Sequence, residues 1–222
     1  TVELLSEKIR EAYKTNWFDF IVEEKCKAGF VIMDGGDRSY GDPAKFRYVQ
    51  RFNYLRLTSK TDIEKLAEQN KIAIKSVDDL VASLEKEFEQ ALEKGFVAVK
   101  VADAYHRSLY FEDVTKEKAQ ADFEKVIKSD KPLDLKEVKA LSDFMMHRII
   151  GLARKYNKPI QVHTGLQAGD GNLIENSNPT LLANLFLQYR DVKFILFHGG
   201  YPFGSELASL AKNFQNVYID LC

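Results

Sequence analysis

The chain has 222 residues, of which 32 are Lys or Arg and 33 are Asp or Glu, so its net charge of -1 offers no field that would attract nucleic acid or an anionic membrane. A hydrophobic fraction of 45% supplies a sizeable core, and the sequence contains neither a signal peptide nor an apolar run near the roughly 20 residues of a membrane helix. The two cysteines, Cys26 and Cys222, form no CxxC spacing, which excludes a cysteine zinc site and favours a reducing, cytoplasmic setting.

The first half of the chain reads as helices mixed with two strands. Apolar spacing predicts the helices, and Ser76 is a good cap for the longest of them. Short apolar or aromatic runs next to glycine predict the strands. In chain order we expect helices over 2–13 and 17–27, a strand over 30–33 closed by Asp34-Gly35-Gly36, a strand over 47–57, and helices over 61–69, starting at a Thr61 cap, and 77–94.

The second half alternates strand and helix at a regular spacing, which is typical of βαβ units and parallel strands. We expect strands over 96–101, 160–163, 194–197 and 217–220, with helices up to 127 and over 134–156, 179–189 and 205–214. Five of the predicted strands end at a chemically capable residue, namely Asp34, Lys100, His163, His198 and Asp220. Because function in a closed barrel lies at the carboxyl ends of the strands, this pattern favours a (β/α)₈ TIM barrel over an open doubly wound sheet.

We expect residues 1–222 to form a single domain that is truncated at both ends. Thr1 opens directly into a helical pattern, and Cys222 directly follows a strand-like run. The predicted fold class is therefore α/β, an incomplete barrel of the metal-dependent hydrolase type.

Alternation along the strands predicts which side chains face the barrel interior. The side chain of Lys100 points to the opposite face of its strand from those of Val99 and Val101, and we expect it to face inward. Gln161 and His163 share a second inward face, and we expect His198 to share one with Phe194 and Leu196.

Two inward histidines on consecutive strands are the most informative pair in the sequence. Adjacent strands lie about 4.8 Å apart, so His163 and His198 can share a divalent metal, or one can bind the metal while the other contacts substrate. The alternative for either histidine alone is a structural residue. Lys100 is either a site residue or a solvated lysine.

Other polar residues admit two interpretations. Tyr105, His106 and Arg107 either contact an anionic or carbonyl substrate or form a polar loop. The glycine-rich loop 165–178 either covers substrate or connects two elements. We expect the remaining candidates, His147, Asp34 and Asp220, to be structural, with Asp34 as a turn former. We expect neither cysteine to be a nucleophile.

At the level of motifs the sequence resembles the amidohydrolase-related (amidohydrolase 2 type) group of metal-dependent TIM-barrel hydrolases. The resemblance is carried by VHTG at 162–165, GDGN, NPTLLANL, KFILFHGGYPF at 193–203, NVYIDLC at 216–222 and KVADAYHRSLYF at 100–111. By motif, His163 matches the fifth-strand histidine of that family, His198 the sixth-strand histidine, and Lys100 the fourth-strand lysine, which some members carboxylate to bridge two metals. The first-strand His-x-His and the eighth-strand Asp of the family have no counterpart in this chain.

The resemblance implies a metal-dependent hydrolase in which a divalent metal, zinc above iron or manganese, activates water for attack on a C–N or C–O bond of a small carbonyl substrate. The metal ligands would be His163 and His198, the catalytic residues His198 and Lys100, and the substrate contacts Tyr105, His106, Arg107 and Gln161. The alternatives are a decarboxylase on the same fold and a non-catalytic barrel that serves as a binding, regulatory or synthetase-associated domain. We expect the partner to be a small-molecule substrate. The sequence is also compatible with a homo-oligomer.

Overall fold

The computed structural model describes residues 1–14, 17–35 and 44–221. The expected turn residue Gly36 and the expected chain-end cysteine Cys222 lie outside that description. By contacts the chain divides into two compact units, Thr1–Tyr48 and Val49–Cys222. Each unit is described by itself.

The smaller unit contains the predicted first helix, α1 (Val2–Tyr13), whose Thr1 cap accepts a hydrogen bond from the Leu4 amide. A short helix α2 (Trp17–Asp19) continues as a π-helical turn over Phe20–Lys25, close to the predicted range. Strand β1 (Val31–Asp34) confirms the predicted strand, but the burial that its apolar run also predicted is wrong, because its residues are half-buried or exposed. Ahead of strand β2 (Phe46–Gln50), Lys45 pairs with Asp19 at 2.7 Å and with Glu23 at 2.6 Å.

The sheet of the larger unit is parallel, and each of its strands pairs with the strand that precedes it in the chain. After the end of β2 the strands are β3 (Ala98–Val101), β4 (Ile160–Val162), β5 (Phe194–Leu196) and β6 (Val217–Ile219). A doubly wound sheet would reverse its strand order at a switch point, and this order does not reverse. The α/β fold and the incomplete (β/α)₈ barrel are therefore as predicted.

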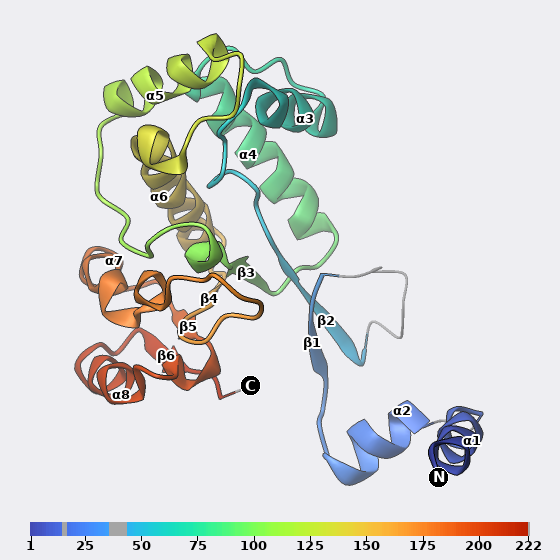
Figure 1. The fold of residues 1–222 in the computed structure, drawn as a ribbon. Helices are drawn as coiled ribbons and strands as arrows, with labels where there is room; N and C mark the ends of the chain where they lie inside the picture. Colours follow the sequence, from blue (N-terminus) through green and yellow to red (C-terminus); the bar gives the residue numbers. More distant parts are fainter. Residues whose placement is uncertain (15–16, 36–43, 222) are drawn as a thin grey trace. The chain divides into compact units, whose positions relative to one another are not determined.

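Helices alternate with these strands (Figure 1). Their bounds are α3 (Lys60–Asn70), α4 (Val77–Glu93), α5 (Lys116–Lys128), α6 (Lys139–Lys155), α7 (Ala183–Gln188) and α8 (Gly204–Asn213). Ser76 caps α4 as predicted, because its side chain accepts from the Asp79 amide. The prediction that Thr61 caps α3 is wrong. The cap is Ser59, two residues before Thr61, and it forms a capping box with Asp62.

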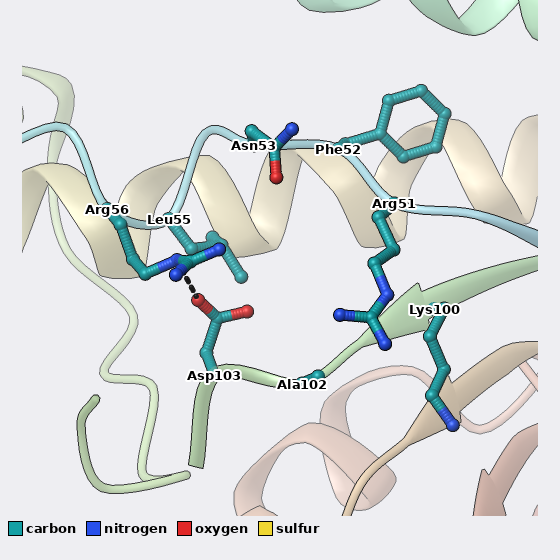
Figure 2. A pocket seen from close by; sticks show the side chains of 8 residues that line it. All are labelled: Arg51, Phe52, Asn53, Leu55, Arg56, Lys100, Ala102 and Asp103. Carbon is teal, nitrogen blue, oxygen red and sulfur yellow. Dashed lines mark ion pairs between the residues drawn. The ribbon is translucent and has the colours of Figure 1, made fainter. Parts of the chain in front are cut away.

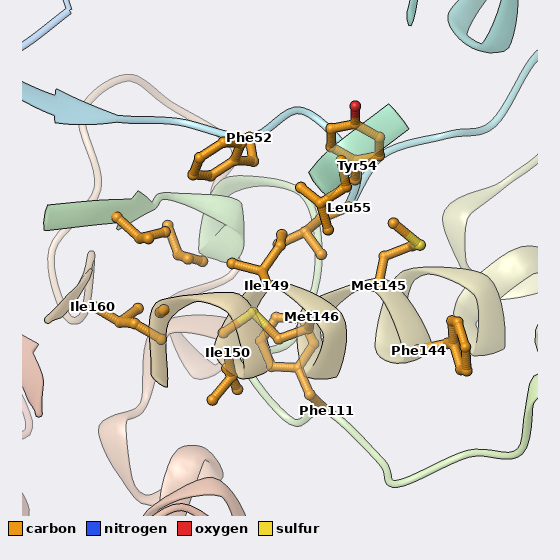
Figure 3. Packing of buried hydrophobic residues seen from close by; sticks show 14 of the residues in the cluster. Phe52, Tyr54, Leu55, Phe111, Phe144, Met145, Met146, Ile149, Ile150 and Ile160 are labelled. Carbon is orange, nitrogen blue, oxygen red and sulfur yellow. The ribbon is translucent and has the colours of Figure 1, made fainter. Parts of the chain in front are cut away.

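The strand predicted over residues 47–57 is wrong in length, because β2 ends at Gln50. The hydrophobic residues that follow Gln50 do not extend the strand. Phe52, Tyr54 and Leu55 are buried in the hydrophobic core, where they pack near Met145 and Ile149 of α6 (Figure 3). Burial of an irregular segment under a helix and burial of a strand leave the same composition in the sequence.

Strand register places the side chains of one rung on one face of the sheet. Val99, Ile160 and Phe194 are paired in register and lie in the hydrophobic core. The next rung sets Lys100 beside Gln161, on the other face. The expectation that His198 shares an inward face with Phe194 and Leu196 is therefore wrong, because those two residues belong to the core layer beneath the helices.

Candidate metal and substrate site

His163 follows β4 directly and is held on two sides. Its backbone amide donates to the Val101 carbonyl at 2.9 Å, which extends the β3–β4 ladder by one residue. Its ring Nε2 donates to the Leu166 carbonyl at 3.0 Å, three residues further along the chain. The imidazole is buried, and the hydrogen bond from Nε2 leaves Nδ1 as the acceptor nitrogen of the neutral ring.

His198 reaches the same place by leaving the strand pattern. The residue lies in a short 3₁₀ turn (His198–Gly200) after β5, with a φ of 63°, in the left-handed region that non-glycine residues rarely adopt. This turn brings His198 Nε2 to 3.0 Å from His163 Nδ1, with ring centroids 4.5 Å apart. Since His163 Nδ1 accepts, His198 Nε2 donates this hydrogen bond.

The electrostatics of the site keep His163 neutral. Burial, together with the neighbouring His198, Lys100 and Arg51, lowers the pKa of His163 to about 4. At neutral pH the ring therefore carries no proton on Nδ1, and that nitrogen is a lone-pair donor directed at His198.

Gly165 locks together the loops that follow β4 and β5. Its φ is 71°, and a Cβ placed on it would lie 2.3 Å from the Tyr201 carbonyl oxygen and 2.6 Å from the Gly200 carbonyl carbon. Only a residue without a side chain allows this approach. The two histidine-bearing loops are thus in direct backbone contact.

Lys100 and Gln161 are neighbours on one rung of β3 and β4, and both are buried. The Lys100 amine lies over the ring of Phe197, with Nζ 3.2 Å from the ring centroid. Phe197 directly precedes His198. A cation over an aromatic face is attracted by the negative charge of that face, so this contact favours the charged amine.

The three candidate residues of the loop after β3 lie in different places. Tyr105 stacks near His163, with ring centroids 4.8 Å apart, and its hydroxyl accepts from the Ala168 amide at 3.3 Å. His106 is exposed, and its Nε2 accepts from Arg56 at 2.8 Å. Arg107 is not brought to the histidine pair.

Arg107 is instead buried against α6. Its guanidinium donates to Asp143 at 2.5 Å, to Ser142 at 2.6 Å and to two backbone carbonyls of its own loop. These bonds account for each of its nitrogens, so we do not carry Arg107 into the proposed site.

Sequence reasoning missed three charged residues near the carboxyl end of β3. Arg51, Arg56 and Asp103 line a recess together with Lys100 (Figure 2). The signal that could have found Arg51 was its place just after a strand, but the overlong predicted strand concealed it.

Gln167 was also missed. It is buried, and within the described part of the chain neither its amide oxygen nor its amide nitrogen has a hydrogen-bond partner. Its chain neighbours Leu166 and Ala168 are the residues that contact His163 and Tyr105. A buried amide with unmet hydrogen-bonding capacity is suited to a ligand or to an ordered water.

The remaining candidates lie away from the pair or take part in it through the backbone. His147 is in α6, where burial lowers its pKa, and its Nδ1 is bonded to the Tyr189 hydroxyl at 2.7 Å. The Asp220 amide donates to Leu196 O at the end of β5, and its carbonyl accepts from Gly199. Asp34 ends β1, and Cys26 is an exposed free thiol.

The donor set fits part of a divalent-metal site. Two Zn–N bonds of about 2.0–2.1 Å at octahedral or tetrahedral angles place their nitrogens about 2.8–3.4 Å apart. The His163 and His198 nitrogens are 3.0 Å apart. The Leu166 carbonyl on the far nitrogen of His163 is the kind of partner that orients a metal-bound imidazole. A catalytic zinc takes three protein ligands, whereas the residues described contain no group of three His, Cys, Asp or Glu that could hold a metal.

The chain is similar to known proteins over much of its length. The family described as Amidohydrolase matches residues 72–222, more than half of the chain. Protein fluG of Emericella nidulans is 41% identical over 90 residues, which cover 38% of this chain and 10% of fluG. Within the described ranges, no helix is long and apolar enough to cross a membrane.

Two solved structures share the fold. A proposed metal-dependent hydrolase from Lactobacillus casei is 21% identical with a TM-score of 0.68, over 92% of this chain and 54% of that one. A uronate isomerase from Thermotoga maritima is 17% identical with a TM-score of 0.71, over 89% of this chain and 50% of that one. The chain thus spans about half the length of these structures and a tenth of its curated relative. On the strength of the family match, the chain belongs to the amidohydrolase family.

Proposed function

We propose that this chain carries part of the active site of a metal-dependent enzyme that hydrolyses a C–N or C–O bond of a small carbonyl compound. The observation that carries the proposal is the 3.0 Å approach of His163 Nδ1 and His198 Nε2 at the carboxyl ends of neighbouring parallel strands. In a barrel this edge is where catalysis takes place. Family membership supports a divalent metal in the same position.

His163 and His198 would hold the metal, which when bound lowers the pKa of water and polarises a carbonyl group. His163 is prepared for this role because it is neutral and because the Leu166 carbonyl fixes its tautomer. To hold a metal through Nε2, His198 would have to carry its ring proton on Nδ1 instead of on Nε2.

The other residues of the site would bind and orient the substrate. Lys100 would supply a fixed positive charge from the barrel interior, in its charged form rather than as a carboxylated lysine, because Phe197 favours a cation over its ring. Tyr105 would form a wall beside His163, and Gln161 would add a buried amide on the same rung as Lys100. Gln167 would donate to and accept from polar atoms of the substrate.

The test is metal content and affinity, measured by elemental analysis after dialysis and by titration with Zn²⁺ and Mn²⁺. We expect saturable binding of Zn²⁺ or Mn²⁺ by the unaltered protein, and at least about a 10-fold loss of affinity in His163→Asn and in His198→Asn. His106→Asn is the matched control, since it removes an exposed imidazole from the neighbouring loop. Equal metal binding by all four proteins would contradict the proposal.

A protein that binds metal through the pair would then be assayed on amides, esters and lactones. Product formation that requires the metal and is lost in both histidine variants is the expected result. Metal-dependent isomerisation or decarboxylation without hydrolysis would retain the metal site and overturn the hydrolytic reaction.

A further inference from the structure

Helix α1, the dark blue helix at the N-terminus in Figure 1, has an apolar face that is exposed to solvent. Apolar side chains recur along it at intervals of three and four residues, which a helix places in line, and we call this set the α1 stripe: Val2, Leu5, Ile9 and Tyr13. Their exposed fractions run from 48% at Ile9 to 77% at Val2, and no residue of α1 is buried. A continuous exposed apolar stripe on a helix is typical of a surface that packs against another helix.

A groove lies beside the carboxyl-terminal half of the α1 stripe. It has a volume of about 390 Å³, and its lining residues are Lys8, Ile9, Ala12, Tyr13 and Trp17. Trp17 begins α2 and belongs to the same unit as α1. Because most of the lining is apolar or aromatic, the groove is suited to an apolar side chain from outside the unit.

The charged residues on one flank of the α1 stripe are sorted by sign along the helix axis. Glu3 and Glu7 lie in the first half of α1, and Arg10 and Lys14 lie at its carboxyl end. At about 100° per residue, these four positions fall within an arc of about 60°. Two such helices packed in parallel would place acid beside acid and base beside base. Two antiparallel helices place Glu3 of each beside Arg10 of the other, so that opposite charges meet.

We propose that α1 is a dimerisation helix, on which α1 of a second copy of this chain packs in the antiparallel direction. Leu5 packs on Ile9 of the other copy, and Val2 enters the groove beside Trp17 of the other copy. A two-fold axis relates the copies, so each contact forms twice. The order of charges on the flank points to a second copy as the occupant, because α1 is complementary to itself when reversed. This inference does not depend on the metal site.

The first test is sedimentation velocity of the whole chain at low salt, over concentrations from about 5 to about 500 µM, because one short helix from each copy makes a small interface. We expect a reversible equilibrium between monomer and dimer. Leu5→Glu would place a carboxylate in the apolar contact, and it should raise the dissociation constant at least about 10-fold.

Leu4→Glu is the matched control for Leu5→Glu. Leu4 is 53% exposed and Leu5 is 60% exposed, so both variants introduce the same charge at neighbouring exposed positions of one helix. Leu4 lies about 100° around the helix from Leu5, on the side away from the α1 stripe. The Leu4→Glu protein should therefore dimerise like the unaltered protein, and circular dichroism checks that both variants keep their helices.

The second test exchanges the charges on the flank. Glu3→Arg and Arg10→Glu each set like charges side by side across the interface, and each should raise the dissociation constant at least about 3-fold. The double variant restores opposite charges between the copies, and its dissociation constant should return to within about 2-fold of the unaltered value. The dipole of a single helix predicts the reverse order, because the double variant places both charges at their unfavourable ends.

Three results would overturn the inference. The first is a monomer at every concentration. The second is a dimer that Leu4→Glu and Leu5→Glu weaken equally or leave unchanged, since the interface would then lie elsewhere on the chain. The third is a double charge variant that dimerises no better than the two single variants, which would exclude the antiparallel pairing of α1.

Discussion

Two polar clusters of the larger unit, each at least partly buried, use their hydrogen-bonding groups differently. Between the loop after β3 and α6, Arg107 and Asp143 saturate one another, with Ser142, Lys139 and backbone groups taking up the remaining bonds. At the ends of β4 and β5, His163 and His198 are joined by one hydrogen bond between ring nitrogens, which His198 Nε2 donates to His163 Nδ1. Both clusters are polar and at least partly buried. They differ in that the histidine pair can exchange its hydrogen bond for a ligand.

The largest effect is expected where the saturated cluster is broken. Arg107→Met leaves the Asp143 carboxylate buried with its main partner removed, and we expect a loss of about 3–5 kcal/mol in the free energy of unfolding, measured with urea. Arg154→Met is the control, because Arg154 and Asp191 form an exposed pair whose loss should cost less than about 1 kcal/mol. Metal affinity of folded Arg107→Met should be unchanged, and a loss of metal binding would show that the clusters are coupled.

A smaller effect on stability, but a direct one on the histidines, is expected at Gly165. In Gly165→Ala the new methyl group meets the Tyr201 carbonyl oxygen, so the loop after β5 must move, at about 1–3 kcal/mol. We expect weaker metal binding as His198 moves with that loop. Gly171→Ala has a similar φ of 74° with nothing within 4 Å of the added carbon, and it isolates the conformational cost from the contact. Equal behaviour of the two variants would show that the contact does not position His198.

Glu87 sharpens the comparison as a buried carboxyl group that is bonded to amides. Gln50 and Asn70 donate to it at 3.5 and 3.4 Å, and burial raises its pKa. Below the pKa of the unfolded chain both states hold the proton, so stability is intact there, and it falls as pH rises through the folded pKa because the folded state must then bury a charge.

We therefore expect Glu87→Gln to stabilise the protein more at about pH 8 than at about pH 4, by urea unfolding at both values. Glu85→Gln, at an exposed position of the same helix, is the control. A gain that does not depend on pH would contradict the raised pKa.

The smallest effect is expected at Tyr105. Tyr105→Phe removes an exposed hydrogen bond from the Ala168 amide and keeps the ring beside His163, so unfolding free energy should change by about 0.5 kcal/mol or less. Metal affinity should stay the same. A large loss of stability would place Tyr105 with the saturated cluster.

Much of the fold follows from local patterns in the sequence. Strand and helix alternation predicted the parallel order of β3 to β6, and strand adjacency predicted that His163 and His198 would meet. The reason given for His198 was wrong, since its approach depends on a left-handed turn that strand alternation does not contain.

The partners of long polar side chains were beyond reach of the sequence. Tyr105 and Arg107 are two residues apart, yet one faces the site and the other is bonded to a helix that lies 36 residues further along the chain. The direction of Arg107 is set by its contact with Asp143, and nothing in the loop itself encodes that contact. Arg51 was hidden for a related reason, because buried aromatic residues after β2 imitate a strand.

The consecutive order of the strands has a consequence for synthesis. Each strand pairs with the one made just before it, so the sheet can grow as the chain leaves the ribosome, without waiting for a distant segment. His198 is made 35 residues after His163. During that interval His163 Nδ1 lacks the hydrogen bond from His198 Nε2, so its lone pair is open to water or to an adventitious metal ion until His198 has been made.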